Sequence, residues 1–325
     1  MKIIRNLNLK TTSSPSLALT IGNFDGVHLG HQKIINEVKK IAAEKKISSA
    51  ILTFEPHPTS LFKPNQAKDF RVTSLAQKLQ IFIEAGIDTT AILSFNQKLS
   101  ELSATDFIQE ILVKTLNVKH LVVGYDFIFG KNREGNFELL KKESKNSEFD
   151  LTEILEVKAE VKDEISAEVK DSERIFSSSM IRKFLREGNV ASANKILGRN
   201  FTIAGLVNEG KQLASQLGFP TMNLKAKPHI IKPKFGVYKT TTFIPHLNQK
   251  FPSITNFGIK PTILETSEPI YETHIPSQYW PDFSRKVYGK KIVIEFLDFV
   301  REEIKFNSLE ELKKQIGMDL VAVGS

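Results

Sequence analysis

The feature of this sequence that most restricts its fold is a regular alternation of short apolar runs and amphipathic stretches between residues 17 and 127. Apolar runs of this length are typical of buried strands, and apolar residues spaced three and four apart are typical of one helix face. The intervening stretches predict helices at 34–42, at 75–83 and from Ser103 onward. Strands and helices that alternate in this way favour a Rossmann-like α/β fold with a parallel sheet. The predicted strands are LALTIGNF (17–24), SAILTF (49–54), AILSF (91–95) and HLVVGYDF (120–127).

Past residue 200 the pattern changes to β-rich segments separated by Pro and Gly turns. Strands without long helices between them favour an antiparallel β-barrel. Ser308, followed three residues later by Glu311, matches a capping box and predicts a terminal helix. The predicted strands are FTIAGLV (201–207), FGVYKTTTF (235–243), SITNF (253–257), YETHI (271–275) and KKIVIEFLDFV (290–300).

The change of pattern indicates two domains, as does the length of 325 residues, because a single domain usually holds about 100–200. The segment LREGNVASANKILGR (185–199) holds two short helical pieces and lies at the expected boundary. We therefore predict domains at 1–186 and 187–325. The charged segment 151–175 suggests an edge hairpin by its alternation, and we attach no function to it.

The composition excludes several kinds of site and compartment. There is no cysteine, which excludes disulfides, thiolate zinc sites and cysteine nucleophiles. No run of about 18 apolar residues occurs, and the N-terminus lacks the apolar core of a signal peptide, so we expect a cytoplasmic protein without membrane contacts. The net charge of +8 comes from lysines scattered along helix faces. Such a surface suits phosphorylated small ligands, and a basic nucleic-acid-binding protein stays as the alternative of another class.

The stretch GNFDGVHLGHQ (22–32) forms the turn from the first predicted strand into the first helix. Glycines there, including Gly22 and Gly30, allow a ligand to approach the backbone, and a helix N-terminus favours anions. His28 and His31 are suited to donate hydrogen bonds to phosphate oxygens, which predicts a nucleotide site. They are also compatible with a plain surface position or, less well, with a metal site, for which no third ligand is evident. The dinucleotide-binding pattern G-x-G-x-x-G is absent.

The segment resembles the H-x-G-H signature of nucleotidylyltransferases and, more narrowly, the start of the bacterial bifunctional riboflavin kinase/FMN adenylyltransferases. Three further segments agree in order: FEPHP (54–58), VVGYDFIFGKNREGN (122–136) and FSSSMIRKFLREGNV (176–190). The resemblance implies an N-terminal nucleotidylyltransferase domain in which FMN and ATP give FAD and pyrophosphate. It also implies roles for single residues. Asn23 and Asp25 would lie close to the nucleotide, Ser177, Ser178 and Arg182 would close over the phosphates, and His57 and Asp126 would lie near the flavin.

Adenylyl transfer needs no general base, because the FMN phosphate is already an anionic nucleophile. The protein must align the reactants and neutralise charge at the α-phosphate of ATP, a role that fits His28, His31 and Arg182. Purely structural roles are also compatible with these residues. Ser177 and Ser178 could cap a helix that carries Arg182 on its surface, His57 could lie in a turn, and Asp126 could lie in a turn or a cap.

The second constellation is LGFPTMNL (217–224), which includes Gly218 and in which Pro220 precedes Thr221 and Asn223. If the segment is extended, these two side chains point the same way, and their oxygens suit Mg²⁺ and the terminal phosphates of ATP. Taken alone, it also reads as a turn that enters a strand. Together with NFGIKPT (256–262), YETHI (271–275) and VREEIKF (300–306), it resembles the riboflavin kinase domain.

A kinase of this type needs a base, because the nucleophile is the neutral 5′-hydroxyl of riboflavin. Glu272 occupies the matching position in the family, and Arg301 lies in the family's flavin-side segment, although a strand glutamate facing water and a surface ion pair are the plain alternatives. The sequence departs from the family's kinase pattern at Met222, where a small residue is expected, and at Ala214-Ser215, where a glycine and a basic residue are expected. An adenylyltransferase with a weak or inactive kinase domain is therefore the closest alternative.

Overall fold

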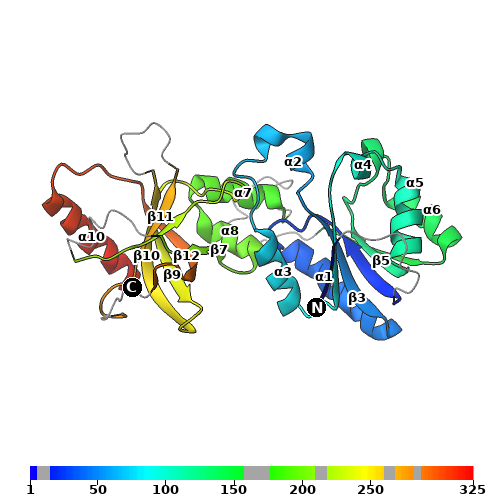
Figure 1. Ribbon diagram of the computed structural model, residues 1–325, viewed down its shortest axis with the longest axis horizontal. Coiled ribbons are helices and arrows are strands. Elements are labelled where there is room, and N and C mark those ends of the chain that lie inside the picture. Colours follow the sequence, from blue (N-terminus) through cyan, green and yellow to red (C-terminus); the bar gives the residue numbers. More distant parts are fainter. Residues whose placement is uncertain (6–14, 157–175, 209–217, 260–267, 281–286, 325) are drawn as a thin grey trace. The chain divides into compact units, whose positions relative to one another are not determined.

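The computed structural model of the chain describes residues 1–5, 15–156, 176–208, 218–259, 268–280 and 287–324 (Figure 1). It divides into two compact units, Met1–Ser178 and Ser179–Ser325. Ala214, Ser215 and most of the segment 151–175 lie outside the described residues. Among the described residues, no helix combines the length and hydropathy needed to cross a bilayer.

The first unit is built on six parallel strands in the order β1-β4-β3-β2-β5-β6. The predicted parallel sheet is thus confirmed, with edge strands β1 and β6 added on either side. The strands are β1 (Lys2–Arg5), β2 (Leu17–Ile21), β3 (Ser48–Phe54), β4 (Thr89–Leu93), β5 (Val118–Gly124) and β6 (Asp150–Ile154). The helical segments are α1 (Leu29–Lys45), α2 (Thr59–Phe62), η1 (Pro64–Gln66), α3 (Leu75–Glu84), α4 (Gln97–Ser100), α5 (Ala104–Asp106), η2 (Phe107–Thr115), η3 (Lys131–Arg133) and α6 (Phe137–Ser147).

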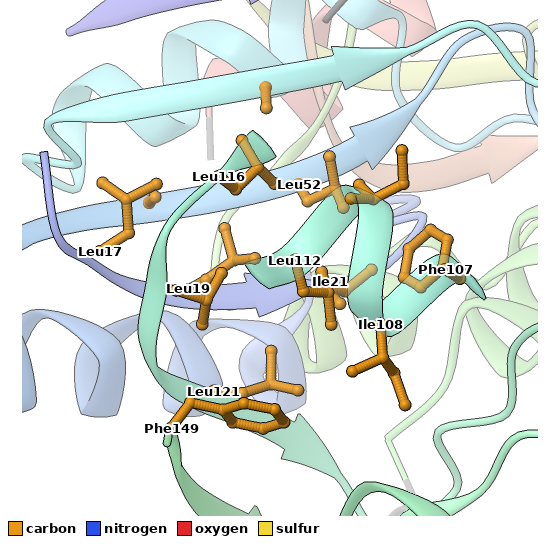
Figure 2. Packing of buried hydrophobic residues seen from close by; sticks show 14 of the residues in the cluster. Leu17, Leu19, Ile21, Leu52, Phe107, Ile108, Leu112, Leu116, Leu121 and Phe149 are labelled. Atoms are coloured by element: carbon orange, nitrogen blue, oxygen red, sulfur yellow. The ribbon is translucent and has the colours of Figure 1, made fainter. Parts of the chain in front are cut away.

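Successive residues of the central strands pack on opposite faces of the sheet, as the two-residue period of a strand requires. On one face Leu19 and Ile21 of β2 join Ile108 and Leu112 of η2 in a buried cluster (Figure 2). On the other face Ala18 packs with residues of α1, and Ile51 of β3 packs with residues of α1 and α3. Helices therefore cover both faces, which leaves the strand ends as the accessible edges of the sheet.

The helix predicted from Ser103 begins there, since the Ser103 hydroxyl accepts the Asp106 N–H at 3.0 Å. It continues into η2, a nine-residue π-helical segment with i→i+5 bonds such as Leu116 N–H to Ile111 O, 3.0 Å. Helices of this type are rare and occur often beside functional sites.

The second unit holds six strands in the order β7-β12-β9-β10-β11-β8, all antiparallel. An isolated bridge from Asn208 to Asn223 links its two edge strands and nearly closes the barrel, as predicted. Ser308 accepts the Glu311 N–H at the start of the terminal helix. The elements are α7 (Ser178–Glu187), α8 (Val190–Leu197), β7 (Phe201–Leu206), β8 (Met222–Lys225), β9 (Gly236–Ile244), β10 (Gln249–Gly258), β11 (Ile270–His274), β12 (Lys291–Arg301) and α10 (Leu309–Gly324).

Candidate functional site

The first candidate site lies where the strand order of the parallel sheet reverses. The chain proceeds from β2 to β3 and β4 on one side and then returns to β5 on the other. In open α/β sheets the crevice at such a switch point, beyond the carboxyl ends of the strands, is the usual ligand site. A cavity of about 830 Å³ lies there, bordered by Ile21 and Gly22 after β2, Phe54 of β3, and Gly124 and Asp126 at the end of β5.

The two histidines predicted from GNFDGVHLGHQ lie against each other at this edge. Their ring centroids are 3.6 Å apart with an angle of 23° between the rings, and His31 borders the cavity while His28 is 6% exposed. Gly30 makes room for this arrangement, because a Cβ there would lie 3.1 Å from Nδ1 of His28. The N-cap residue His28 makes no side-chain capping bond, and the first turn of α1 contains no acidic residue, so the N–H groups and positive dipole end of this helix favour an anion.

The loop that carries the histidines is held by bonds to distant segments. The buried Asp25 carboxylate accepts the N–H groups of Val72 and Thr73 at 2.8 and 3.3 Å, and the Thr73 hydroxyl accepts the Gly26 N–H. Ser178 donates its hydroxyl to the Asp25 carbonyl at 2.8 Å. Asp25 and Ser178 thus fix the backbone of the loop, whereas Asn23 borders the cavity.

Asn23 stands out among the residues that border the cavity. Its side-chain oxygen Oδ1 is buried and has no hydrogen-bond partner among the described residues, whereas its main-chain carbonyl accepts a bond from Lys78 Nζ at 2.6 Å. A buried polar atom without a partner is costly in a folded protein and is often explained by a ligand. Lys78 belongs to none of the sequence motifs that predicted this site.

The remaining predicted residues of this half lie as follows. His57 accepts the Thr59 N–H at Nδ1, 3.2 Å, and its ring lies 5.2 Å from that of Phe70. Asp126 is exposed at the cavity border. Ser177 is half-buried just before α7. Arg182 belongs to the second unit, where its Nη2 donates to the Ser179 hydroxyl at 3.2 Å.

The second candidate site is a row of polar side chains across three strands of the barrel. Asn223 of β8 pairs with Glu272 of β11, and Glu272 pairs with Asn256 of β10. Directly paired residues project from the same face of a sheet with Cβ atoms roughly 5 Å apart, so the three side chains are neighbours. Asn223 is 7% exposed, and its buried Oδ1 has no hydrogen-bond partner in the part of the chain that the structure describes. Asn256 in turn donates to Glu303 at 3.3 Å.

The segment that precedes β8 is hydrogen-bonded to β11, the strand that carries Glu272. His274, 6% exposed, bonds through Nδ1 to the Pro220 carbonyl at 2.8 Å, immediately before Thr221. Burial lowers the pKa of the His274 imidazole, and this hydrogen bond partly opposes the shift. Gly218 has φ +90°, a backbone region that favours glycine. Met222 is fully buried and, by strand alternation, projects opposite to Asn223.

Arg301 forms a paired contact with the terminal helix. Its Nε and Nη2 donate to both carboxylate oxygens of Asp319 in α10, at 2.8 and 2.6 Å. Asp319 is only 5% exposed, so the pair is well shielded from water. In the part of the chain that the structure describes, no group of three or more His, Asp or Glu side chains is placed to hold a metal.

Comparisons with known proteins match both halves of the chain. Residues 10–168 match the FAD synthetase family model, and residues 197–324 match the riboflavin kinase model. The bifunctional riboflavin kinase/FMN adenylyltransferase of Buchnera aphidicola subsp. Schizaphis graminum is 36% identical over 99% of this chain and 98% of that protein. The enzyme of the same description from Escherichia coli strain K12 is 35% identical over 98% of this chain and 96% of its own.

A solved structure shares the whole fold. It is described as a macrolide-efflux protein from Streptococcus pneumoniae, with a TM-score of 0.85 and 26% identity over 100% of this chain and 99% of its own. That description names an activity that neither family model carries, and the sequence matches to each half and to full-length relatives are the more specific finding. The chain belongs to the bifunctional riboflavin kinase/FMN adenylyltransferase family.

Proposed function

We propose that this chain catalyses two successive steps of flavin cofactor synthesis. The second unit transfers the γ-phosphoryl group of ATP to riboflavin, giving FMN and ADP. The first unit transfers the adenylyl group of a second ATP to FMN, giving FAD and pyrophosphate. The observation that carries this proposal is the pair of stacked imidazoles at the switch point, in a chain whose two halves match the two enzyme families.

In the first unit the chemistry is alignment and charge neutralisation. The FMN phosphate attacks the α-phosphorus of ATP, and the bond to the departing pyrophosphate breaks. His28 and His31 donate hydrogen bonds to the phosphates, and the uncapped start of α1 adds its N–H groups. Gly22 and Gly30 allow the nucleotide to approach the backbone, and the Asn23 amide binds it at the cavity border.

The other residues that the family resemblance implies for adenylylation complete the binding of both substrates. Asp25 acts through the backbone of the loop, and Ser177, Ser178 and Arg182 form a phosphate clamp at the start of α7. A guanidinium and hydroxyls suit phosphate oxygens because charge-assisted hydrogen bonds are short and strong. His57 and Asp126 contact the flavin.

In the second unit Glu272 is the base that accepts the proton of the riboflavin 5′-hydroxyl as it attacks the γ-phosphorus. Gly218, Thr221 and Asn223 bind ATP. Arg301 supports the flavin side through its pair with Asp319, which holds α10 on the barrel. Met222, which departs from the family pattern, lies inside the barrel and leaves the face of Glu272 and Asn223 unobstructed.

The buried, unpartnered Oδ1 of Asn223 suits a hard cation, because amide and hydroxyl oxygens are ligands that Mg²⁺ accepts. Thr221 and Asn223 would hold Mg²⁺ together with the phosphates of ATP. When bound, the ion neutralises charge on the polyphosphate.

The test is to incubate the purified chain with riboflavin, ATP and Mg²⁺ and to identify the flavins by chromatography. We expect FMN and then FAD. His28→Ala should stop the reaction at FMN, and Glu272→Ala should form FAD only from supplied FMN. The opposite partition contradicts the assignment of the two units. Single-turnover conversion of riboflavin to FMN separates this proposal from an adenylyltransferase with an inactive kinase unit.

The substrates of the proposed enzyme are riboflavin, FMN and ATP, and we place it in the cytoplasm without nucleic-acid or membrane partners. Retention on RNA that weakens steeply with salt would contradict this part of the proposal, because counterion release makes nucleic-acid binding salt-dependent.

A further inference from the structure

Lys78 is a buried cation on the apolar face of a helix. In α3 the residues Leu75, Leu79 and Phe82 face the core, and Lys78 lies three residues after Leu75 on the same face. Its exposed fraction is 4%. Lysine is almost never buried to this extent unless its charge has a specific partner.

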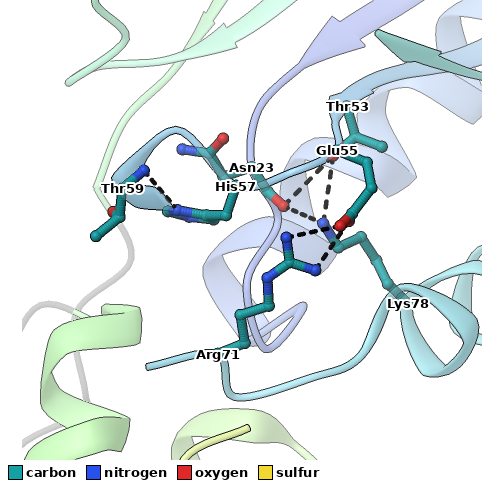
Figure 3. Close-up of polar contacts among 7 residues, drawn as sticks. All are labelled: Asn23, Thr53, Glu55, His57, Thr59, Arg71 and Lys78. Atoms are coloured by element: carbon teal, nitrogen blue, oxygen red, sulfur yellow. Dashed lines mark hydrogen bonds and ion pairs between the residues drawn. The ribbon is translucent and has the colours of Figure 1, made fainter. Parts of the chain in front are cut away.

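The Lys78 ammonium is hydrogen-bonded to the loop that follows β2 and borders the cavity. Its Nζ donates to the Asn23 carbonyl at 2.6 Å and lies 3.4 Å from the Thr53 hydroxyl, which itself donates to the Asn23 carbonyl (Figure 3). The Asn23 amide lies on the other side of the main chain from Lys78 (Figure 3). The same residue thus receives Lys78 at its main-chain carbonyl and borders the cavity.

We propose that Lys78 is a positioning residue for FMN adenylylation: its ammonium fixes the Asn23 main chain, so that the Asn23 amide keeps its place in the cavity wall. This inference rests on the proposed function of the first unit. Positioning matters here because adenylyl transfer without a general base depends on alignment, and a displacement of about 1 Å can cost roughly a hundredfold in rate. The charge also adds to the positive potential that favours anionic substrates.

The charged groups around Lys78 come from three segments. Asp25 follows β2, Glu55 follows β3, and Arg71 precedes α3 and is bound to Glu55 by two bonds of 2.8 Å. Burial lowers the pKa of Lys78 to about 8, with Arg71 adding to the shift and Asp25 and Glu55 opposing it. Lys78 is therefore charged at pH 7 and becomes neutral above about pH 8. The neutral amine makes a weaker hydrogen bond, since charge-assisted bonds are about twice as strong.

The experiment compares the two activities of the full-length chain. We expect Lys78→Met to lower kcat/KM for the conversion of FMN to FAD by about tenfold to a hundredfold, mainly in kcat. Phosphorylation of riboflavin by the same preparation should change less than twofold, because it belongs to the second unit, and urea unfolding followed by circular dichroism reports whether the first unit has folded. Lys40→Met is the matched control, because Lys40 carries the same charge on an exposed face of α1, and both activities should be unchanged.

The pH profile separates positioning from a merely structural role. In the unaltered chain kcat/KM for FMN adenylylation should fall several-fold between pH 7 and pH 9.5, with a midpoint near pH 8. The profile of Lys78→Arg should lack this decline, since a guanidinium stays charged above pH 12. If circular dichroism shows that the first unit of Lys78→Met has not folded, the profiles of the unaltered chain and of Lys78→Arg decide.

Two results would overturn the inference about Lys78. One is a flat pH profile of FMN adenylylation in the unaltered chain. The other is a kcat/KM of Lys78→Met within twofold of that of the unaltered chain. In both cases FAD is still formed, so the proposed function of the first unit stands. A chain that makes no FAD from FMN at any pH instead refutes the proposed function of the first unit.

Discussion

Asn223 of β8 and Glu272 of β11 stand directly opposite each other in an antiparallel pair, on the face away from the fully buried Met222. This pairing brings a candidate ligand of Mg²⁺ and ATP beside a candidate base, although 49 residues separate them in the sequence. The assignment of the kinase site to the second unit depends on this pairing.

We predict that Asn223→Ala raises the Mg²⁺ concentration needed for half-maximal riboflavin phosphorylation, because it removes the unpartnered Oδ1. Titration of Mg²⁺ at saturating ATP measures the change, and roughly tenfold is expected from the loss of one ligand. The control is Asn307→Ala, since Asn307 is an exposed asparagine that precedes α10. An unchanged Mg²⁺ requirement in Asn223→Ala would exclude Asn223 as a ligand.

We predict that Gly30→Ala reduces FAD formation from FMN by about tenfold, because a Cβ would lie 3.1 and 3.2 Å from two atoms of the His28 ring. The ring has little room to move, since it is buried and stacked on His31. Steady-state assays of both activities check the prediction, and riboflavin phosphorylation should be unaffected. Full FAD synthesis by Gly30→Ala would show that the stacked arrangement is not required.

The buried His274 predicts a pH dependence of stability in the second unit. Its pKa in the folded state lies below the ordinary 6.5, so the unfolded chain binds the proton more readily. The stabilisation is complete above about pH 6.5 and is lost as the pH falls toward the folded-state pKa. Urea unfolding at pH 7.5 and 5.5 measures it, and the single tryptophan, Trp280, stacked on Phe251, reports on this unit.

The matched variant for this measurement is His274→Asn, whose amide keeps a donor for the Pro220 carbonyl but does not titrate. We expect the urea midpoint of this variant to fall less between pH 7.5 and 5.5 than that of the unaltered chain. An equal fall in both proteins would assign the pH dependence to other groups.

We predict that Gly317→Ala stabilises the second unit by about 0.5–1 kcal/mol, because glycine inside a helix costs roughly that much relative to alanine. Gly317 lies in α10, and a Cβ added there meets no atom within 4 Å. The urea midpoint should rise with both activities unchanged. A lower midpoint would mean that the glycine is needed for how α10 packs.

Local spacing in the sequence is enough to predict most of the elements and the fold class. Apolar runs and helix periodicity depend on local spacing, so β2, β3, β4 and β5 were predictable, as was the cap at Ser103. The stretch from Gly22 to Gln32 indicated a phosphate site because its glycines and histidines are adjacent in the chain. Less apolar edge strands such as β1, with exposed residues on both faces, carry too weak a pattern to be recognised.

Which distant groups share a site depends on how the elements pack. Lys78 left one trace in the sequence, a cation on an otherwise apolar helix face, but its partner Asn23 is 55 residues away. Likewise, the packing of α10 brings Asp319 to Arg301. The strand register places Glu272 opposite both Asn223 and Asn256. Burial and pairing depend on how elements pack, because the same side chain is solvated on one face and desolvated on the other. Residue spacing therefore predicts the helices and strands, whereas packing determines which side chains meet in a site.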